Sequence, residues 1–504
     1  MSANALPAGG SVALEDALEP LVLALDVGST ASRGGLYDAA GRPVQGLRHK
    51  VPHHFTTGAD GTSEIDAGAV AGEVAEIITE VLAKKAGAGG RVAGVALDTF
   101  ASSLVGVDAD GRTLTPCYTY ADSRCAPQLQ QLRDELDEAE VQQRTGTRLH
   151  TSYLPARLRW LRDTDPATFQ RVERWLSLGE YVYLGLLGTT AAGTSTAAWT
   201  GLLDRRTGEW DEQMLAVAGV RREQLSEIRD PARPLSDVAG RAASRWPELA
   251  GAVWFPVITD GFASNIGAGA HDESTIAAAA ATSGAMRVVV HGVPDEIPSG
   301  LWCYRVDTSR TLLGGALNDV GRMVTWLDQT LRQEDLESAT RAAALLADPD
   351  PAAPLVLPYL TGERSTGWAG SARAVMAGVS AATTAPMIFR GAMEGVALTY
   401  ARVAEQLQRA AGRAQRIVAS GRVAADLPEW LQVLSDALGA PVEHVTMKRT
   451  TLHGTALIAL EALAPDVPRA DVTVGASYAP APGREAYYAE RLARYQRLYD
   501  AVIA

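Results

Sequence analysis

The sequence predicts an α/β protein of two domains, and three features support this prediction. The chain has 504 residues, more than one hydrophobic core usually serves. Short apolar stretches typical of buried strands alternate with stretches of helical periodicity. A hairpin plan of apolar strand, small polar turn and apolar strand occurs twice, at 21–38 and at 276–290. One copy in each half indicates an internally duplicated protein.

The first hairpin has a turn suited to binding phosphate. Its first strand, 21–27, is apolar enough to be buried on both faces, and the turn after it contains Gly28, Ser29 and Thr30. The second strand is predicted to resume at Gly35. Backbone N–H groups and hydroxyls in such a turn can converge on one anion. Asp26 ends the strand and would face the same point, where a carboxylate can hold Mg²⁺ with its water shell. An ordinary glycine hairpin is the alternative for this copy alone.

The second hairpin favours the phosphate interpretation. Its turn, Thr282, Ser283 and Gly284, again joins two apolar strands. Two phosphate hairpins, one in each half, predict an ATPase with its nucleotide in a cleft between the halves.

Composition excludes several classes of partner. The net charge of −13 argues against non-specific binding to nucleic acid or to anionic membranes. No apolar stretch approaches the roughly 20 residues of a membrane helix, and 1–20 does not resemble a signal peptide. The three cysteines have no metal-ligand spacing, which fits a reducing compartment. We therefore expect a soluble, cytoplasmic protein with no nucleic-acid or membrane partner.

The rest of the first half carries a candidate sugar-binding wall. Strands are predicted at 43–51, 92–97 and 104–107, with a helix from Asp66. Tyr120, Asp122 and Arg124 then combine an aromatic face with groups that hydrogen-bond hydroxyls, the mixture a polyol needs. The alternative is that Asp122 and Arg124 tie a loop to the start of a helix.

The second half begins with a carboxylate at a strand end. A strand at 252–258 leads to Asp260, which precedes Gly261 and a helix of small residues, so a ligand can approach closely. A helix N-cap is the alternative role for Asp260. Farther on, we expect a strand, a glycine turn at Gly314 and Gly315 and a helix, then a long helix with a core stripe at 389–407.

These motifs resemble the FGGY carbohydrate kinases of the actin-like ATPase superfamily. The segment 150–210 is similar to the gluconokinase branch, and Ser420 with Gly421 matches the layout of the family's adenosine-binding turn. The resemblance implies two ribonuclease H-like domains, at 20–258 and 259–504, with sugar and nucleotide between them.

The resemblance also implies a role for each candidate residue. Asp260 would be the catalytic base and contact the acceptor hydroxyl, and Asp26 would hold Mg²⁺. Sugar contacts would come from Tyr120, Asp122, Arg124 and Ser102. ATP contacts would come from Gly28, Ser29, Thr30, Arg33, Thr282, Ser283, Gly284, Gly314, Gly315, Ser420, Gly421 and Asp426.

The sequence departs from the family pattern at two places. Ala101 and Ser102 stand where relatives carry Trp and His, which leaves the sugar open, and Arg422 replaces a usual glycine, which leaves ATP binding open. We expect a kinase for a sugar or sugar acid, with gluconate as first choice. A pentulose kinase of the xylulose or ribulose type and a non-catalytic sugar or nucleotide sensor are the alternatives. The oligomeric state, monomer or homodimer, stays open.

Overall fold

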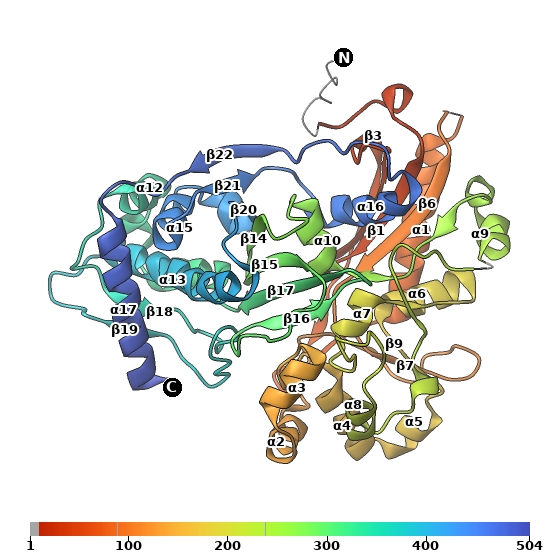
Figure 1. Ribbon diagram of the computed structural model, residues 1–504, viewed down its shortest axis with the longest axis horizontal. Coiled ribbons are helices and arrows are strands. Elements are labelled where there is room, and N and C mark those ends of the chain that lie inside the picture. The colour runs from red at the N-terminus through yellow and green to blue at the C-terminus, as the bar shows by residue number, and fades with distance from the viewer. Residues whose placement is uncertain (1–9, 88, 237, 504) are drawn as a thin grey trace. The chain divides into compact units, whose positions relative to one another are not determined.

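Two mixed β-sheets organise the chain (Figure 1). The computed structural model describes residues 10–503 apart from Ala88 and Asp237. The first sheet has the order β12-β6-β1-β2-β3, with β13 also paired to β6. Its strands are β1 (Leu21–Val27), β2 (Ala31–Tyr37), β3 (Pro43–Pro52), β6 (Val92–Thr99), β12 (Val253–Trp254) and β13 (Ile258–Thr259).

The second sheet has the order β16-β17-β15-β14-β20-β21-β22. Its strands are β14 (Thr275–Ala280), β15 (Gly284–His291), β16 (Trp302–Arg305), β17 (Arg310–Leu317), β20 (Arg416–Ser420), β21 (Val442–Val445) and β22 (Val474–Tyr478). In both sheets a strand pairs antiparallel with the next strand of its hairpin and parallel with a later strand: β1 with β2 and β6, and β14 with β15 and β20. The predicted duplication is therefore confirmed, and both sheets follow the ribonuclease H-like plan.

The chain forms two compact units that alternate along the sequence. Unit 1 contains the described residues up to Gly267, together with 303–312 and 448–472, and unit 2 contains 268–302, 313–447 and the described residues from 473 onward. The predicted domains had a single boundary between 258 and 259. Helix α10 (Asp260–Gly267) belongs to unit 1, and the chain returns to unit 1 twice, at 303–312 and in the segment that contains α16 (Thr450–Leu463).

The sheet of unit 1 has one face of large side chains and one of small ones. Leu23, Leu25 and Leu97 lie in the buried cluster that also contains the apolar face of α1 (Ala67–Lys85). The opposite face carries small residues such as Gly35 and Gly94, where α16 packs directly on β1 and β6 (Figure 1). Small residues let the helix backbone approach the strands, so α16 lies close to the ends of β1 and β6.

Helices α10 and α16 cross at two glycines. A Cβ atom at Gly454 would overlap the carbonyl oxygen of Ala263, and one at Gly267 would overlap the carbonyl oxygen of Thr450. The backbones are therefore in direct contact at this crossing, which only glycine permits.

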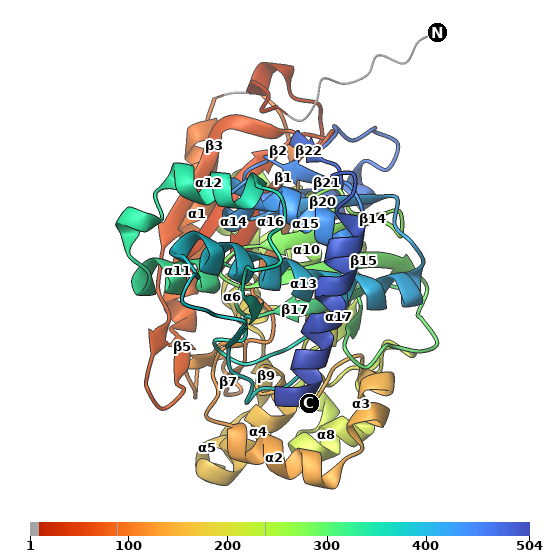
Figure 2. The ribbon, with the colours of Figure 1, turned by 90° about the vertical axis from the view of Figure 1, so that its left-hand side faces the viewer.

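Unit 2 is built around the predicted long helix, α13 (Ala385–Ala411). Its expected core stripe, from Phe389 to Leu407, is buried. Helix α17 (Glu485–Val502) packs against α15 (Trp430–Leu438) (Figure 2). It also contacts strand β18 (Leu355–Leu357).

Three details of the predicted secondary structure need correction. The second strand of the first hairpin starts at Ala31 and not at Gly35, so the turn is only Gly28 to Thr30. The strand expected at 252–258 is split into β12 and β13, because Pro256 between them has no N–H to donate. The expected glycine turn at Gly314 and Gly315 does not form, since both residues lie inside β17.

The expectations about membrane helices and about the cysteines can be compared with the structure. No helix among the described residues is long and apolar enough to cross a membrane. Cys117, Cys125 and Cys303 are buried free thiols, and burial raises the pKa of the Cys117 thiol to about 12. A thiol with so high a pKa is unreactive at neutral pH, so these cysteines are packing residues.

Replacing Gly454 with alanine should destabilise unit 1. The added methyl group would force α10 and α16 apart, and overpacking of this kind costs about 1–3 kcal/mol or more. Urea unfolding followed by circular dichroism measures the loss.

Gly72→Ala in α1 is the matched control, because a Cβ at this exposed helical glycine meets no atom within 4 Å. It should stabilise the protein by about 0.4–1 kcal/mol. Equal midpoints of urea unfolding for the two variants would show that stability does not depend on the close contact between α10 and α16.

Candidate active site

Three carboxylates lie at one edge of the sheet in unit 1. Asp26 is near the end of β1 and Asp98 near the end of β6, and the two residues are directly paired in the parallel register. Asp260 follows β13, which pairs with β6 so that Ile258 lies beside Asp98. The carboxyl ends of neighbouring parallel strands are a usual place for ligand sites.

Asp26 is held by an arginine of the neighbouring strand. Its partner in the antiparallel register is Arg33, whose Nη1 lies 2.9 Å from Asp26 Oδ2. Burial nevertheless raises the pKa of the Asp26 carboxyl, although the charge of Arg33 opposes this shift. Arg33, expected to contact ATP, therefore partly balances the charge of the Asp26 carboxylate.

Asp98 lies beside Asp26 in the candidate site and was not among the residues predicted from the sequence. It is fully buried, and Thr455 of α16 donates a hydrogen bond of 2.5 Å to its Oδ2. Its Oδ1 has no hydrogen-bond partner among the described residues. Burial first, and then the charge of Asp26, raise the pKa of the Asp98 carboxyl well above its ordinary value. The available signal was an Asp at the end of a second parallel strand, one residue beyond the strand predicted at 92–97.

The first phosphate turn is supported from beneath by a histidine. His53 places Nε2 2.8 Å from the carbonyl oxygen of Gly28 and Nδ1 2.8 Å from Glu73 Oε2. Ser32, just after the turn, donates a hydrogen bond of 2.7 Å to the same oxygen of Glu73. This network fixes the backbone of Gly28, while Thr30 at the tip of the turn is exposed.

The predicted sugar wall contains an aromatic cluster. Tyr120 is 37% exposed, and its ring lies 6.1 Å from that of Phe100 and 6.4 Å from that of Phe55. Phe55, which sequence reasoning missed, also packs edge-on against Phe100 at 5.1 Å. The cluster holds the Tyr120 ring in a fixed position, as an aromatic sugar contact requires.

Asp122 and Arg124 instead make the contacts expected of a structural pair. Asp122 is buried, accepts a hydrogen bond from the backbone N–H of Ser63, and lies 2.7 Å from Arg124 Nη2. Arg124 also pairs with Glu64 at 2.5 Å and stacks over Trp160. These contacts favour the alternative in which the two residues tie a loop to a helix start. Substrate binding by either residue stays a prediction.

Ser102 and Asp260 lie beside a second aromatic group. Ser102 has a positive φ of 57° and donates a hydrogen bond of 2.6 Å to the carbonyl oxygen of Trp199. Trp199 stacks on Tyr304 with ring centroids 3.7 Å apart, and it also packs against Gly261, next to Asp260. Trp199, which was not predicted as a site residue, therefore lies beside the residue that follows the candidate catalytic base.

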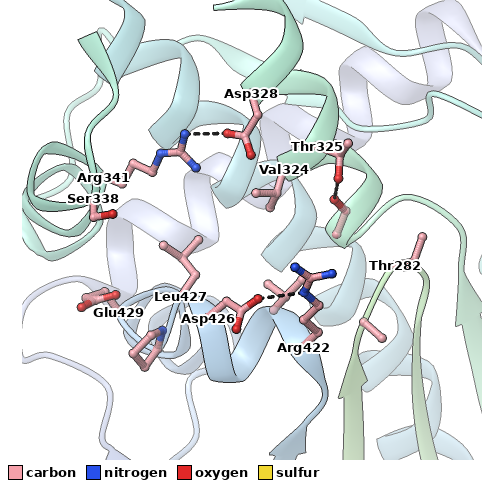
Figure 3. Close-up of a pocket in the computed structure, with 14 residues that line it drawn as sticks. Thr282, Val324, Thr325, Asp328, Ser338, Arg341, Arg422, Asp426, Leu427 and Glu429 are labelled. Atoms are coloured by element: carbon pink, nitrogen blue, oxygen red, sulfur yellow. Dashed lines mark hydrogen bonds and ion pairs between the residues drawn. The ribbon is translucent and has the colours of Figure 1, made fainter. Parts of the chain in front are cut away.

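Unit 2 contains a cavity of about 410 Å³ next to the second phosphate turn (Figure 3). Thr282 and Gly321 line one side, and Arg422 and Asp426 of α14 (Arg422–Asp426) line another. Arg422 is bonded to Asp426 at 2.9 Å with its side chain 87% exposed, so it forms the rim and does not fill the cavity. Gly421 precedes α14 with φ of 106°, where a Cβ would meet the backbone of Ala280.

Gly314 and Gly315 do not line this cavity. Both are packed inside the sheet, Gly314 against Trp302 and Gly315 against Ser365. The expectation that they contact the nucleotide therefore has no support in the geometry of unit 2. The glycine that lines the cavity is Gly321. The second turn itself is present, with Thr282 and Ser283 exposed and Gly284 packed against Tyr400.

The donor set at the sheet edge suits a hard divalent cation. Within the described ranges, no group of three or more His, Cys, Asp and Glu side chains is arranged to hold a metal. Asp26 and Asp98, however, form a pair of carboxylates, one of which has an oxygen without a donor. Mg²⁺ takes one or two protein carboxylates and completes its shell with water and phosphate oxygens, so these residues fit it.

Both halves of the chain match models of one protein family. Residues 21–267 match the N-terminal domain model of the FGGY family of carbohydrate kinases, and residues 274–463 match its C-terminal domain model. A gluconokinase of Bacillus subtilis (strain 168) is 25% identical over 84% of this chain and 83% of its own length. A glycerol kinase of Geobacter sp. (strain M21) is 28% identical over 87% of this chain and 89% of its own length.

Solved structures have the same fold. The crystal structure of a gluconate kinase from Lactobacillus acidophilus has a TM-score of 0.88 at 24% identity, covering 96% of this chain and 98% of that one. A ligand-bound xylulose kinase from the same organism also has a TM-score of 0.88, at 25% identity, with the same coverage.

The buried Asp98 carboxyl predicts a pH-dependent stability. Because its pKa is raised from 3.8 in the folded state, the folded protein binds this proton more tightly than the unfolded chain does. This contribution is fully present below the unfolded pKa and is lost as pH rises through the folded pKa. Asp98→Asn should therefore be more stable than the parent at about pH 7.5, with a smaller advantage at about pH 4.5.

Urea unfolding at both pH values tests this, with Asp60→Asn as control. Asp60 is exposed, and hydrogen bonds from Thr62 lower the pKa of its carboxyl. Asp60→Asn should therefore make the protein less stable than the parent. An Asp98→Asn variant less stable than the parent near neutral pH would contradict the raised pKa.

Proposed function

Because the chain belongs to the FGGY family of carbohydrate kinases, we propose that it transfers the γ-phosphate of ATP to a primary hydroxyl of gluconate. The observation that carries the proposal is the position of Asp260, beside the edge where Asp26 and Asp98 end their strands. A carboxylate there can accept the proton of an acceptor hydroxyl while the phosphate turn holds the donor.

The proposed mechanism depends on positioning and on charge neutralisation. Phosphoryl transfer needs an in-line arrangement and groups that balance charge on the phosphate oxygens, but little covalent chemistry from the protein. Asp260 would orient the hydroxyl and accept its proton. Asp26 would hold Mg²⁺, which when bound balances phosphate charge, and the turns at Gly28 to Thr30 and Thr282 to Gly284 would donate N–H groups to phosphate oxygens.

The cavity of unit 2 is the proposed place for the adenosine part of ATP. It opens beside Thr282, and its rim carries Arg422 and Asp426 (Figure 3). The exposed position of Arg422 supports an open pocket, and it leaves the guanidinium near the second turn, where it can contact a phosphate.

One observation supports gluconate as the acceptor. Gluconokinases from two Bacillus species are 25% and 23% identical to the chain, each over 84% of its length.

A pentulose is the second candidate acceptor, because the xylulose kinase from Lactobacillus acidophilus is equally similar in structure. A non-catalytic sensor is disfavoured by the presence of both Asp26 and Asp260. A cytoplasmic location is part of the proposal, supported by the three free thiols.

The test is a panel of acceptors assayed for ATP consumption. Gluconate, xylulose, ribulose and glycerol are compared by kcat/KM, with the phosphorylated product identified. Gluconate should give the highest value. A preference for a neutral acceptor would overturn the substrate assignment, and nucleotide binding without turnover on any acceptor would favour the sensor.

Asp260→Asn should remove phosphoryl transfer and leave ATP binding intact. Loss of a general base costs about 10²- to 10⁴-fold in rate, whereas this carboxylate is proposed to face the acceptor. Steady-state assays measure the rate, and calorimetry with ATP measures the affinity. A variant that retains the parent rate would refute the role of Asp260 as base.

A further inference from the structure

Asp98 and Asp26 share one face of the sheet in unit 1. They are paired in the parallel register of β1 and β6, and neighbouring strands lie about 4.8 Å apart, so two paired side chains on one face are neighbours. The face is the one that α16 covers, since Thr455 of α16 donates to Asp98 Oδ2. The two carboxyl groups are therefore next to each other beneath the phosphate turn.

Carboxyl groups outnumber the recorded cationic partners around this pair. Asp26, Asp98 and Asp260 bring three carboxyl groups to the sheet edge. Arg33 pairs with Asp26, and among the described residues no ion pair is recorded for Asp98, whose donor is the neutral hydroxyl of Thr455. Two buried carboxylates side by side repel each other unless a cation or a proton lies between them.

One oxygen of Asp98 has no assigned function within the protein. Thr455 fixes Oδ2, and Oδ1 is buried without a hydrogen-bond partner in the described part of the chain. Unpaired buried polar atoms are rare, and a nearby ion is one of the few explanations for them. A carboxylate oxygen is also a ligand that Mg²⁺ prefers.

We propose that Asp98 is a second carboxylate ligand, beside Asp26, for the divalent cation of the phosphoryl-transfer site. The inference rests on the proposed function, which places Mg²⁺ at Asp26. Thr455 is then a positioning residue, because its hydrogen bond turns the Asp98 carboxyl so that Oδ1 stays available. Phosphate oxygens and water complete the coordination shell of the cation, as is usual for Mg²⁺ with two protein carboxylates.

The experiment measures metal binding directly and not only activity. Mn²⁺ is titrated into the full-length protein in the presence of ADP, and free Mn²⁺ is followed by electron paramagnetic resonance. Asp98→Asn keeps the shape of the side chain and removes its charge. It should raise the Kd for Mn²⁺ by about tenfold or more, while the Kd for ADP in EDTA changes by less than about twofold.

Thr455→Val tests the positioning role. It removes the hydrogen bond to Asp98 Oδ2 but keeps both carboxylates, and loss of a partner that orients a ligand should raise the Kd for Mn²⁺ by about tenfold. Thermal unfolding of each variant without metal shows that it is folded. If Asp98→Asn does not fold, Asp98→Ser repeats the test with a smaller side chain.

The outcomes separate this inference from the proposed function. A folded Asp98→Asn variant with the Mn²⁺ affinity of the parent overturns the ligand role of Asp98 alone, provided that the parent phosphorylates a sugar. A folded Thr455→Val variant with the Mn²⁺ affinity of the parent overturns the positioning role of Thr455. A parent protein that binds neither ADP nor Mn²⁺ overturns the proposed function and this inference together.

Discussion

The candidate active site depends on the close packing of α16 on the sheet of unit 1. This packing needs small residues on one face of β1, β2 and β6, and it needs Gly267 and Gly454 where α10 crosses α16. Because the helix backbone lies close to the strands, Thr455 reaches Asp98, and α10 presents Asp260 beside the same strand ends. A bulkier face would move both helices away from the carboxylates.

This packing buries two acidic side chains, and burial of a charged carboxylate is costly. Asp26 and Asp98 are buried at neighbouring positions, and the contacts recorded for them include Arg33 and one threonine hydroxyl. Burial raises the pKa of both carboxyls, which means that the folded state tolerates their charge poorly. A protein gains no stability from such a pair, so a function in binding a cation and its phosphate ligands accounts for it best.

The two hairpins share one plan but are supported by different contacts. The first turn is held by His53 and Glu73, which bond to the carbonyl oxygen of Gly28 and to Ser32. The second turn bonds instead to the first residues of α11 (Gly321–Thr330), because Gly321 and Arg322 donate to the carbonyl oxygens of Ala281 and Thr282. Duplication thus preserved the strand order, while each turn acquired its own partners, and a cavity formed beside the second.

The sequence by itself determined the two hairpins, the helix from Asp66, the two carboxylates Asp26 and Asp260, and the family, because local periodicity and short motifs carry these features. Tertiary structure alone decided the rest. Asp98 came to lie beside Asp26 through the pairing of β6 with β1, Asp122 and Arg124 acquired Ser63 and Glu64 as further partners, and Gly314 and Gly315 lie inside β17. Residues far apart in sequence meet only when strand register and helix packing are set, and no local pattern records that register.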